Sequence, residues 1–176
     1  TATDRTTTVV VPLLHGPMGE DGTIQGAIEM AHVAYVGSGV LASAVSMDKS
    51  MTKSLLDAAG IAQPRWIALR HDEALPARLE AIGNDLGWPV FVKPANMGSS
   101  VGVHKCSSAN ELVAGARDAL GFDEWILVEE AVRGRELEVA VLGNESPRAS
   151  VVGEIVPGRE FYDYADKYEG DTAQLL

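Results

Sequence analysis

Trp88-Pro-Val-Phe-Val-Lys-Pro-Ala-Asn-Met-Gly-Ser-Ser-Val-Gly-Val-His-Lys105 is the stretch that decides the fold of this chain. Val90 to Val92 are the β-branched and aromatic residues of a buried strand. We expect this strand to end at Lys93, because Pro94 cannot continue the pairing. The turn Gly98 to Gly102 offers backbone N–H groups and serine hydroxyls that can surround phosphate oxygens. The pattern indicates a nucleotide phosphate site.

A plain hairpin is the alternative interpretation of the same turn. The stretch is not a P-loop, because Lys93 precedes the glycines instead of following them. A glycine-serine turn between two strands often does no more than connect them. Lys105, on the expected return strand, adds a second basic residue. The rest of the chain decides between the two interpretations.

Composition and charge narrow the possible partners. The chain has 176 residues, of which 46% are hydrophobic and 22% charged, as in a globular protein of one or two domains. A net charge of −11, with no basic run, argues against a nucleic-acid binder. An anionic ligand must therefore be held by lysines gathered in one cleft.

Cysteine usage and hydropathy bear on the cellular location. The longest uncharged stretch, Val33 to Met47, is too short and too polar to span a bilayer, and no signal peptide is visible. The single cysteine, Cys106, excludes an internal disulfide and fits a reducing compartment. We expect a cytoplasmic protein with no membrane partner.

The N-terminal part has the pattern of an α/β ligand site. Val9 to Leu14 predicts a buried strand, a glycine-rich turn runs to Gly22, and a helix is expected over Thr23 to Ala31. The unpaired N–H groups of such a helix attract anions. His15, at the expected end of the strand, either joins this site or only bonds the nearby loop.

A second strand and a helix follow. We expect the strand over Val33 to Gly39 and one helix over Met47 to Ala59, ended by Gly60. Its apolar face is predicted to consist of Met47, Met51, Leu55 and Ala58. Lys49 and Lys53 lie on the polar face and are either solvated, which the helical pattern alone favours, or half of a phosphate site.

Residues 61 to 132 predict a small α+β unit. A strand over Arg65 to Leu69 precedes a helix marked by Leu75, Leu79, Ile82 and Leu86. Ser108-Ala-Asn-Glu111 is a capping box that opens a helix ending before Gly121, and Trp125 to Val128 forms the next strand. We expect the helices to pack on one face of a mostly antiparallel sheet.

Carboxylates follow this last strand. Glu129 and Glu130, flanked by Ala131 and Val132, can hydrogen-bond an amino-purine beside hydrocarbon, or simply face water. The segment Glu136 to Leu142 alternates like a half-buried strand. On it, Glu136 and Glu138 share a face that can bind a ribose hydroxyl or remain solvated.

Two segments complete the pattern. Ser150 to Val156 predicts another strand. Phe161-Tyr-Asp-Tyr-Ala-Asp-Lys-Tyr168 is an aromatic and charged loop whose hydroxyls and ammonium can close over a ligand.

Four sequence blocks, taken together, resemble the D-alanine:D-alanine ligases of the ATP-grasp superfamily, in the order of that family. The resemblance covers nearly the whole chain from Val9 onward. The blocks are Leu14-His-Gly-Pro-Met-Gly-Glu-Asp-Gly-Thr-Ile-Gln-Gly26, Ser43-Ala-Val-Ser-Met-Asp-Lys49 with Lys53, Phe91-Val-Lys-Pro with Gly98-Ser-Ser-Val-Gly102, and Phe161 to Tyr168.

This resemblance implies an α/β chain with an α+β ATP-grasp architecture in three parts. Residues 1–45 would be the C-terminal part of an N-terminal substrate-binding α/β domain. Residues 46–132 would be the central ATP-grasp subdomain. Residues 133–176 would begin the C-terminal catalytic domain with its active-site loop.

The resemblance also implies an activity, the ATP-dependent formation of D-alanyl-D-alanine for peptidoglycan through a D-alanyl phosphate. The residues that would contact the ATP phosphates are Lys53, Lys93, Ser99 and Ser100. Those that would hold the adenine are Glu129, Glu130, Ala131 and Val132, and Glu136 would hold the ribose. Those that would cover the nucleotide are Phe161, Tyr162 and Lys167. The catalytic set would be His15 near the first D-alanine, Ser99 and Tyr168 linking the loop over the substrate, and Lys167.

Further expectations concern the rest of the site. ATP would act with Mg²⁺ or Mn²⁺, whose ligands we expect beyond Leu176, so no metal ligand is assigned in this chain. The family's first segment would precede Thr1, and a full-length enzyme would be a homodimer. We expect this chain by itself to show no turnover.

Other functions compatible with the sequence are another ATP-grasp carboxylate-amine ligase, a D-alanine:D-lactate ligase, or a non-catalytic nucleotide-binding module. The Lys167-Tyr168 pair favours D-alanine as the second substrate. A parent gene without metal ligands would favour the module.

Overall fold

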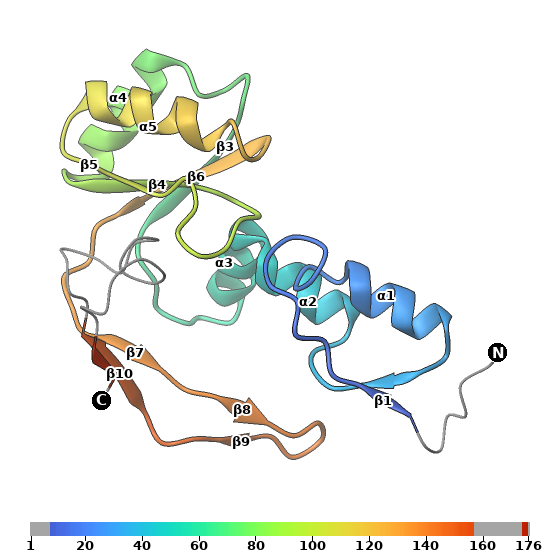
Figure 1. Ribbon diagram of the computed structural model, residues 1–176. Coiled ribbons are helices and arrows are strands. Elements are labelled where there is room, and N and C mark those ends of the chain that lie inside the picture. Colours follow the sequence, from blue (N-terminus) through green and yellow to red (C-terminus); the bar gives the residue numbers. More distant parts are fainter. Residues whose placement is uncertain (1–7, 157–173, 176) are drawn as a thin grey trace. The chain divides into compact units, whose positions relative to one another are not determined.

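The computed structural model describes residues 8–156 and 174–175, which belong to two compact units, 1–131 and 132–176 (Figure 1). Within the described ranges, no helix is both long and apolar enough to cross a bilayer.

The first unit begins with a short βαβ arrangement. Strand β1 (Val9–Val10) pairs in parallel with β2 (Ala34–Tyr35), and helix α1 (Thr23–Met30) connects them. The predicted helix is confirmed. The two strands are shorter than predicted, because only two residues of each take part in the pairing.

The helix predicted over Met47 to Ala59 is confirmed as α3 (Lys49–Ala58), which begins two residues later than expected. A further helix that was not predicted, α2 (Val40–Met47), precedes it. Asp48 separates them with an extended backbone (φ −81°, ψ 106°), and its carboxylate accepts hydrogen bonds from the N–H groups of Ser50 (2.8 Å) and Met51 (3.1 Å). Asp48 is thus the N-cap of α3. The α2 segment shows no amphipathic pattern, since it carries no charged residue.

The predicted apolar face of α3 is wrong. Met51 and Leu55 are more than half exposed, whereas Ser50 is buried. The side of α3 that faces the rest of the unit is the one that carries its lysines. The expected end of the helix is confirmed, because Gly60 follows the C-cap Ala59 with φ of +70°.

A four-stranded antiparallel sheet forms the centre of the first unit. Its strands, in spatial order, are β3 (Trp66–Arg70), β6 (Trp125–Glu130), β4 (Val90–Pro94) and β5 (His104–Cys106). Helices α4 (Pro76–Leu86) and α5 (Ala109–Ala119) pack over one face of this sheet (Figure 1). The predicted α+β unit is confirmed.

Pro94 does not end β4, contrary to expectation. It remains in register with Ile126 of β6, whereas the pairing of β4 with β5 stops at Val92 and His104. A proline can stay in a ladder where no backbone donor is needed. The strand therefore carries Lys93 inside the sheet, with pairing continuing past it on one side.

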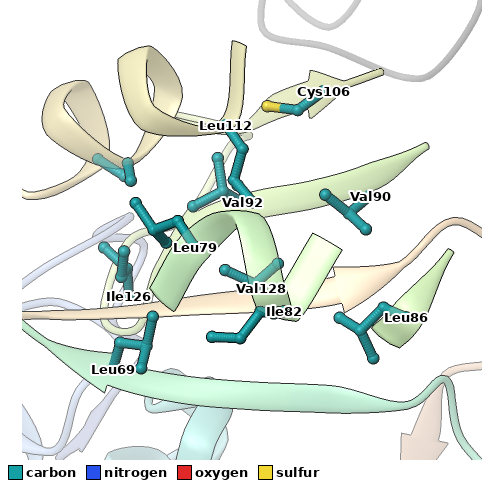
Figure 2. Packing of buried hydrophobic residues seen from close by; sticks show 12 residues of the cluster. Leu69, Leu79, Ile82, Leu86, Val90, Val92, Cys106, Leu112, Ile126 and Val128 are labelled. Carbon is teal, nitrogen blue, oxygen red and sulfur yellow. The ribbon is translucent and has the colours of Figure 1, made fainter. Parts of the chain in front are cut away.

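The core lies between the sheet and its two helices (Figure 2). It consists of Leu69, Leu79, Ile82, Leu86, Val90, Val92, Cys106, Leu112, Ala116, Ala119, Ile126 and Val128. The capping box at the start of α5 is confirmed with one change. The Ser108 hydroxyl accepts from the Glu111 N–H (3.4 Å), but the Glu111 carboxylate accepts from Ser107 (2.8 Å).

The second unit contains short antiparallel pairings. A three-stranded sheet has the order β11 (Gln174–Leu175), β10 (Gly153–Val156), β7 (Glu136–Glu138), and β8 (Val141–Leu142) pairs with β9 (Arg148–Ala149).

Both strands predicted in this unit differ from the structure. The predicted strand Glu136 to Leu142 is divided into β7 and β8, and its residues are exposed. At the break, the Ala140 N–H donates to the Ser150 hydroxyl (3.0 Å), which replaces a ladder partner. The strand predicted from Ser150 begins only at Gly153.

We expect Leu112→Ala to lower the free energy of unfolding by about 2 to 5 kcal/mol, because it leaves a cavity in a fully buried position. Urea denaturation followed by circular dichroism measures the change. Leu75→Ala removes an exposed leucine from the same unit and serves as the matched control. Equal effects of the two substitutions would contradict the assigned core.

Candidate functional site

Glu129 lies between two lysines on the sheet face opposite α4 and α5. The Lys53 Nζ is 3.0 Å from Glu129 Oε2, and the Lys93 Nζ contacts Oε1. The side chains of Lys53 and Glu129 are only 12% exposed, and that of Lys93 is 20% exposed. Each carboxylate oxygen therefore has its own ammonium partner.

Strand register explains how Lys93 reaches Glu129. Glu129 of β6 stands opposite Phe91 of β4, so Lys93, two residues further along β4, is its diagonal neighbour on the same face. The alternate residues Val90 and Val92 are fully buried in the core on the other face. The sheet thus separates the core from this polar cluster.

Lys49 is the third lysine of the cluster and lies beneath the glycine-serine turn. Its Nζ donates to the carbonyl oxygens of Ala95 (3.2 Å) and Met97, and its backbone N–H also donates to Ala95 O (3.1 Å). Lys49, Lys53, Lys93 and Glu129 are called the Glu129 cluster below. The N-terminus of α3 is bonded directly to the residues that precede the turn.

Burial and charge lower the pKa of Lys49. Removal of the ammonium from water is the larger cause and the nearby Lys93 charge the next, and together they lower the pKa from 10.5 to about 8. Asp123, Asp48 and Glu129 act in the opposite direction but do not outweigh them. The charged form of Lys49 is therefore less favoured than that of a solvated lysine.

Burial and charge act on Glu129 in opposite directions. Burial disfavours the carboxylate, but Lys93 and Lys53 outweigh it and hold the pKa of Glu129 below its usual value. The carboxylate is therefore ionised at neutral pH. Three ammonium groups are thus gathered in one place in a chain of net charge −11.

Asp123 fixes the base of the glycine-serine turn from the other side. Its Oδ2 accepts from the Asn96 backbone N–H (2.7 Å) and side-chain amide (2.9 Å), and its Oδ1 accepts from the Trp125 N–H (3.2 Å). The turn starting at Asn96 is thus anchored to the strand β6 as well as to α3.

The turn itself has a preset curvature. Ser99 and Ser100 have φ of +51° and +60°, and Gly102 has φ of +67°. A Cβ on Gly102 would lie 2.8 Å from the Phe122 ring and 2.9 Å from Pro94, so only glycine fits there. A left-handed backbone at consecutive residues curves the chain sharply, and successive backbone N–H groups in a turn can bind an anion.

Glu130 is predicted to contact the adenine, but its carboxylate binds Arg65. It accepts from the Arg65 backbone N–H (3.0 Å) and from Arg65 Nε (3.1 Å), and the backbone bond is the larger cause of its lowered pKa. The Arg65 guanidinium also donates to the carbonyls of Asp85 and Leu86. The Glu130 carboxylate therefore ties β3 and α4 to β6.

The other predicted site residues are spread along the chain. His15 is exposed in the connection between β1 and α1, beyond the end of β1. Ala131 ends the first unit, and its N–H donates to Pro89 O (3.3 Å). Val132 and Glu136 are exposed in the second unit. Phe161, Tyr162, Lys167 and Tyr168 lie outside the described residues.

Lys49 is the residue that the predicted site lacked. The helical spacing predicted that Lys49 and Lys53 share a face, and one interpretation was that both point into water. That interpretation is wrong, because both side chains are largely buried. Helical spacing showed that the two lysines share a side. It contained no information on the loop, 46 residues later, that covers Lys49.

The described residues include no group of three or more His, Cys, Asp or Glu side chains that could hold a metal ion. The polar groups present are ammonium groups, a carboxylate and backbone amides. Such a set suits an anion such as a phosphate.

Family models match the chain in two segments. The model described as the D-ala D-ala ligase C-terminus matches residues 55–176, and the one described as the D-ala D-ala ligase N-terminus matches residues 1–38.

Curated relatives match over the whole chain. A D-alanine--D-alanine ligase of Bacillus pumilus is 52% identical over 100% of this chain and 50% of its own length. One of Geobacillus kaustophilus is 50% identical over 98% of this chain and 48% of its own length. The chain spans about half the length of these relatives.

Solved structures show the same relationship. The VanG D-Ala:D-Ser ligase of Enterococcus faecalis has a TM-score of 0.84 at 36% identity, over 96% of this chain and 49% of its own. The D-alanyl-alanine synthetase A of Vibrio cholerae has a TM-score of 0.82 at 36% identity, over 96% of this chain and 51% of its own.

We expect the Lys49 ammonium to titrate with a midpoint near pH 8, measured by NMR of the ¹⁵N-labelled side chain. Lys93→Met removes a neighbouring positive charge and should move the midpoint upward, but not to the unperturbed 10.5, because Lys49 stays buried. An unchanged midpoint in Lys93→Met would contradict the proximity of the two lysines.

The same titration affects stability. Between the lowered pKa of about 8 and the unperturbed value of 10.5, the folded chain binds fewer protons at Lys49 than the unfolded chain. This group therefore makes the free energy of unfolding rise with pH in that window. Lys49→Met should remove its contribution, as measured by urea denaturation at several pH values.

Proposed function

The chain belongs to the D-alanine–D-alanine ligase family, whose fold is the ATP-grasp fold, and from this premise we propose that it serves the ATP-dependent joining of two D-alanine molecules. The family that the sequence blocks resemble is thereby confirmed, as is the α/β ATP-grasp fold class. Because the chain spans about half the length of its curated relatives, the activity is proposed for the full-length protein that contains it.

The single observation that carries this proposal is the position of Lys49 and Lys93 at the glycine-serine turn. Lys49 bonds the carbonyls directly before the turn, and Lys93 stands on the strand that leads into it. The Glu129 cluster gathers three ammonium groups, and the adjoining turn can offer backbone amides. A nucleotide polyphosphate can interact with both.

In the proposed reaction the terminal phosphoryl group of ATP moves to the carboxylate of the first D-alanine. The amine of the second D-alanine then attacks the acyl phosphate, which yields D-alanyl-D-alanine, ADP and phosphate. Phosphoryl transfer depends mainly on positioning and on neutralisation of charge. The lysines and the amides of the turn, including Ser99 and Ser100, would supply both to the phosphates.

The remaining assignments are part of the same proposal. Glu129 to Val132 would border the adenine, with Glu130 acting through its backbone because Arg65 holds its carboxylate. Glu136 would bind the ribose, and His15 would lie near the first D-alanine. The residues proposed to close over the nucleotide and substrate are Phe161, Tyr162, Lys167 and Tyr168. We also propose that the chain divides into part of an N-terminal substrate-binding domain (1–45), the central ATP-grasp subdomain (46–132) and the beginning of the catalytic domain (133–176).

Mg²⁺ or Mn²⁺ would accompany the nucleotide and offset charge on its phosphates. The described residues hold no group of three or more His, Cys, Asp or Glu side chains for such an ion. For the full-length protein we propose a cytoplasmic homodimer that supplies peptidoglycan synthesis.

D-Alanine is the proposed second substrate. The Lys167-Tyr168 pair favours it, and curated relatives named D-alanine--D-alanine ligase are 48 to 52% identical to the chain. D-Serine and D-lactate are therefore the comparison substrates in the assay.

We expect Lys93→Met to lower D-alanine-dependent phosphate release from ATP by roughly 100-fold, as loss of a group that stabilises transition-state charge does elsewhere. The assay uses the protein expressed from its complete reading frame. Arg78→Met, which removes a charge from an exposed pair with Glu73, should leave the rate unchanged. A wild-type protein that binds ATP but releases no phosphate with D-alanine would contradict the proposed reaction.

A further inference from the structure

We propose that Lys53 is a positioning residue, which stays paired with Glu129 while Lys93 exchanges Glu129 for a nucleotide phosphate. This inference rests on the proposed nucleotide site, but it assigns Lys53 a role other than direct phosphate contact. It begins from the unequal surroundings of the two lysines that share Glu129.

The Lys53 ammonium also contacts the side-chain amide of Gln63. Its Nζ is 3.5 Å from Gln63 Oε1 and 3.0 Å from Glu129 Oε2. The Gln63 amide donates both of its hydrogens, to the Lys53 carbonyl (2.7 Å) and to Asp57 Oδ1 (2.6 Å). An amide with both donors engaged keeps its oxygen in one direction, and here that direction is toward Lys53.

The support extends to β3. The second oxygen of Asp57 accepts from the Trp66 indole N–H (3.2 Å). The chain of contacts thus runs from Trp66 through Asp57 and Gln63 to Lys53 and ends at Glu129. Each member fixes the next, so the Lys53 ammonium is directed at Glu129.

Lys93 has a different environment. It stands on β4 next to Pro94, where the strand leads into the glycine-serine turn, and its side chain is more exposed than that of Lys53. Its ammonium donates a hydrogen bond to Glu129 Oε1. Of the two lysines, Lys93 is the one placed to turn toward a ligand in the loop.

Movement of Lys93 to a phosphate would leave the Glu129 carboxylate with Lys53 as its ammonium partner. When Lys93 leaves, one oxygen of a nearly buried carboxylate loses its counter-ion, and an unpaired buried charge is strongly unfavourable. Lys53 remains on the other oxygen and keeps Glu129 neutralised. Without Lys53, Glu129 would retain Lys93 and oppose its transfer to the phosphate.

A double-mutant cycle tests this role, since it separates action through Glu129 from direct contact with phosphate. The four proteins are the full-length wild type, Lys53→Met, Glu129→Gln and the double variant. Calorimetry measures binding of ATP and of inorganic tripolyphosphate, a probe that avoids any effect of Glu129 on the adenine.

We expect Lys53→Met to weaken tripolyphosphate binding about tenfold when Glu129 is present and less than about twofold in the Glu129→Gln background, a difference of about 1 kcal/mol between backgrounds. Lys53→Arg should restore most of the affinity, because it keeps the positive charge. Arg70→Met removes a charge from the exposed pair with Glu124 and is the matched control for net charge.

An equal loss in both backgrounds would overturn the inference and make Lys53 a direct phosphate ligand. If Lys53→Met is misfolded by circular dichroism, the cycle is run with Lys53→Gln, for which the same two outcomes apply. A wild-type protein that binds neither ATP nor tripolyphosphate would contradict the proposed function itself, which distinguishes the two failures.

Discussion

The pairing of one nearly buried carboxylate with two ammonium groups is the interaction on which the site depends. Glu129 is fixed by β6, Lys93 by β4 and Lys53 by α3, so a single carboxylate joins the central sheet to a helix earlier in the chain. Burial makes the arrangement sensitive to charge, because each group needs a partner.

The same helix connects the cluster to the glycine-serine turn. Asp48 caps α3 and so fixes where the helix begins, which places Lys49 against the carbonyls of Ala95 and Met97. Asp123 holds the other side of the loop base. The positions of the loop and of the lysines are therefore set together, as expected of a site organised before its ligand binds.

The sequence predicted those parts of the fold that depend on local periodicity. The α+β unit and the capping box at Ser108 follow from apolar spacing and hydrogen-bonding side chains, and the structure confirms them. Helix α2 was not predicted, because its segment carries no charged residue and so shows no polar face. The surroundings of Lys49 and Lys53 depend on residues about 45 to 75 positions away, which local patterns do not encode.

A crystal structure of the full-length protein with a non-hydrolysable ATP analogue tests the central claim most directly. The account predicts phosphate oxygens within hydrogen-bond distance of Lys93 and of the turn at Ser99, with Lys53 still paired to Glu129. A nucleotide bound away from the glycine-serine turn, with Lys93 still on Glu129, would contradict it.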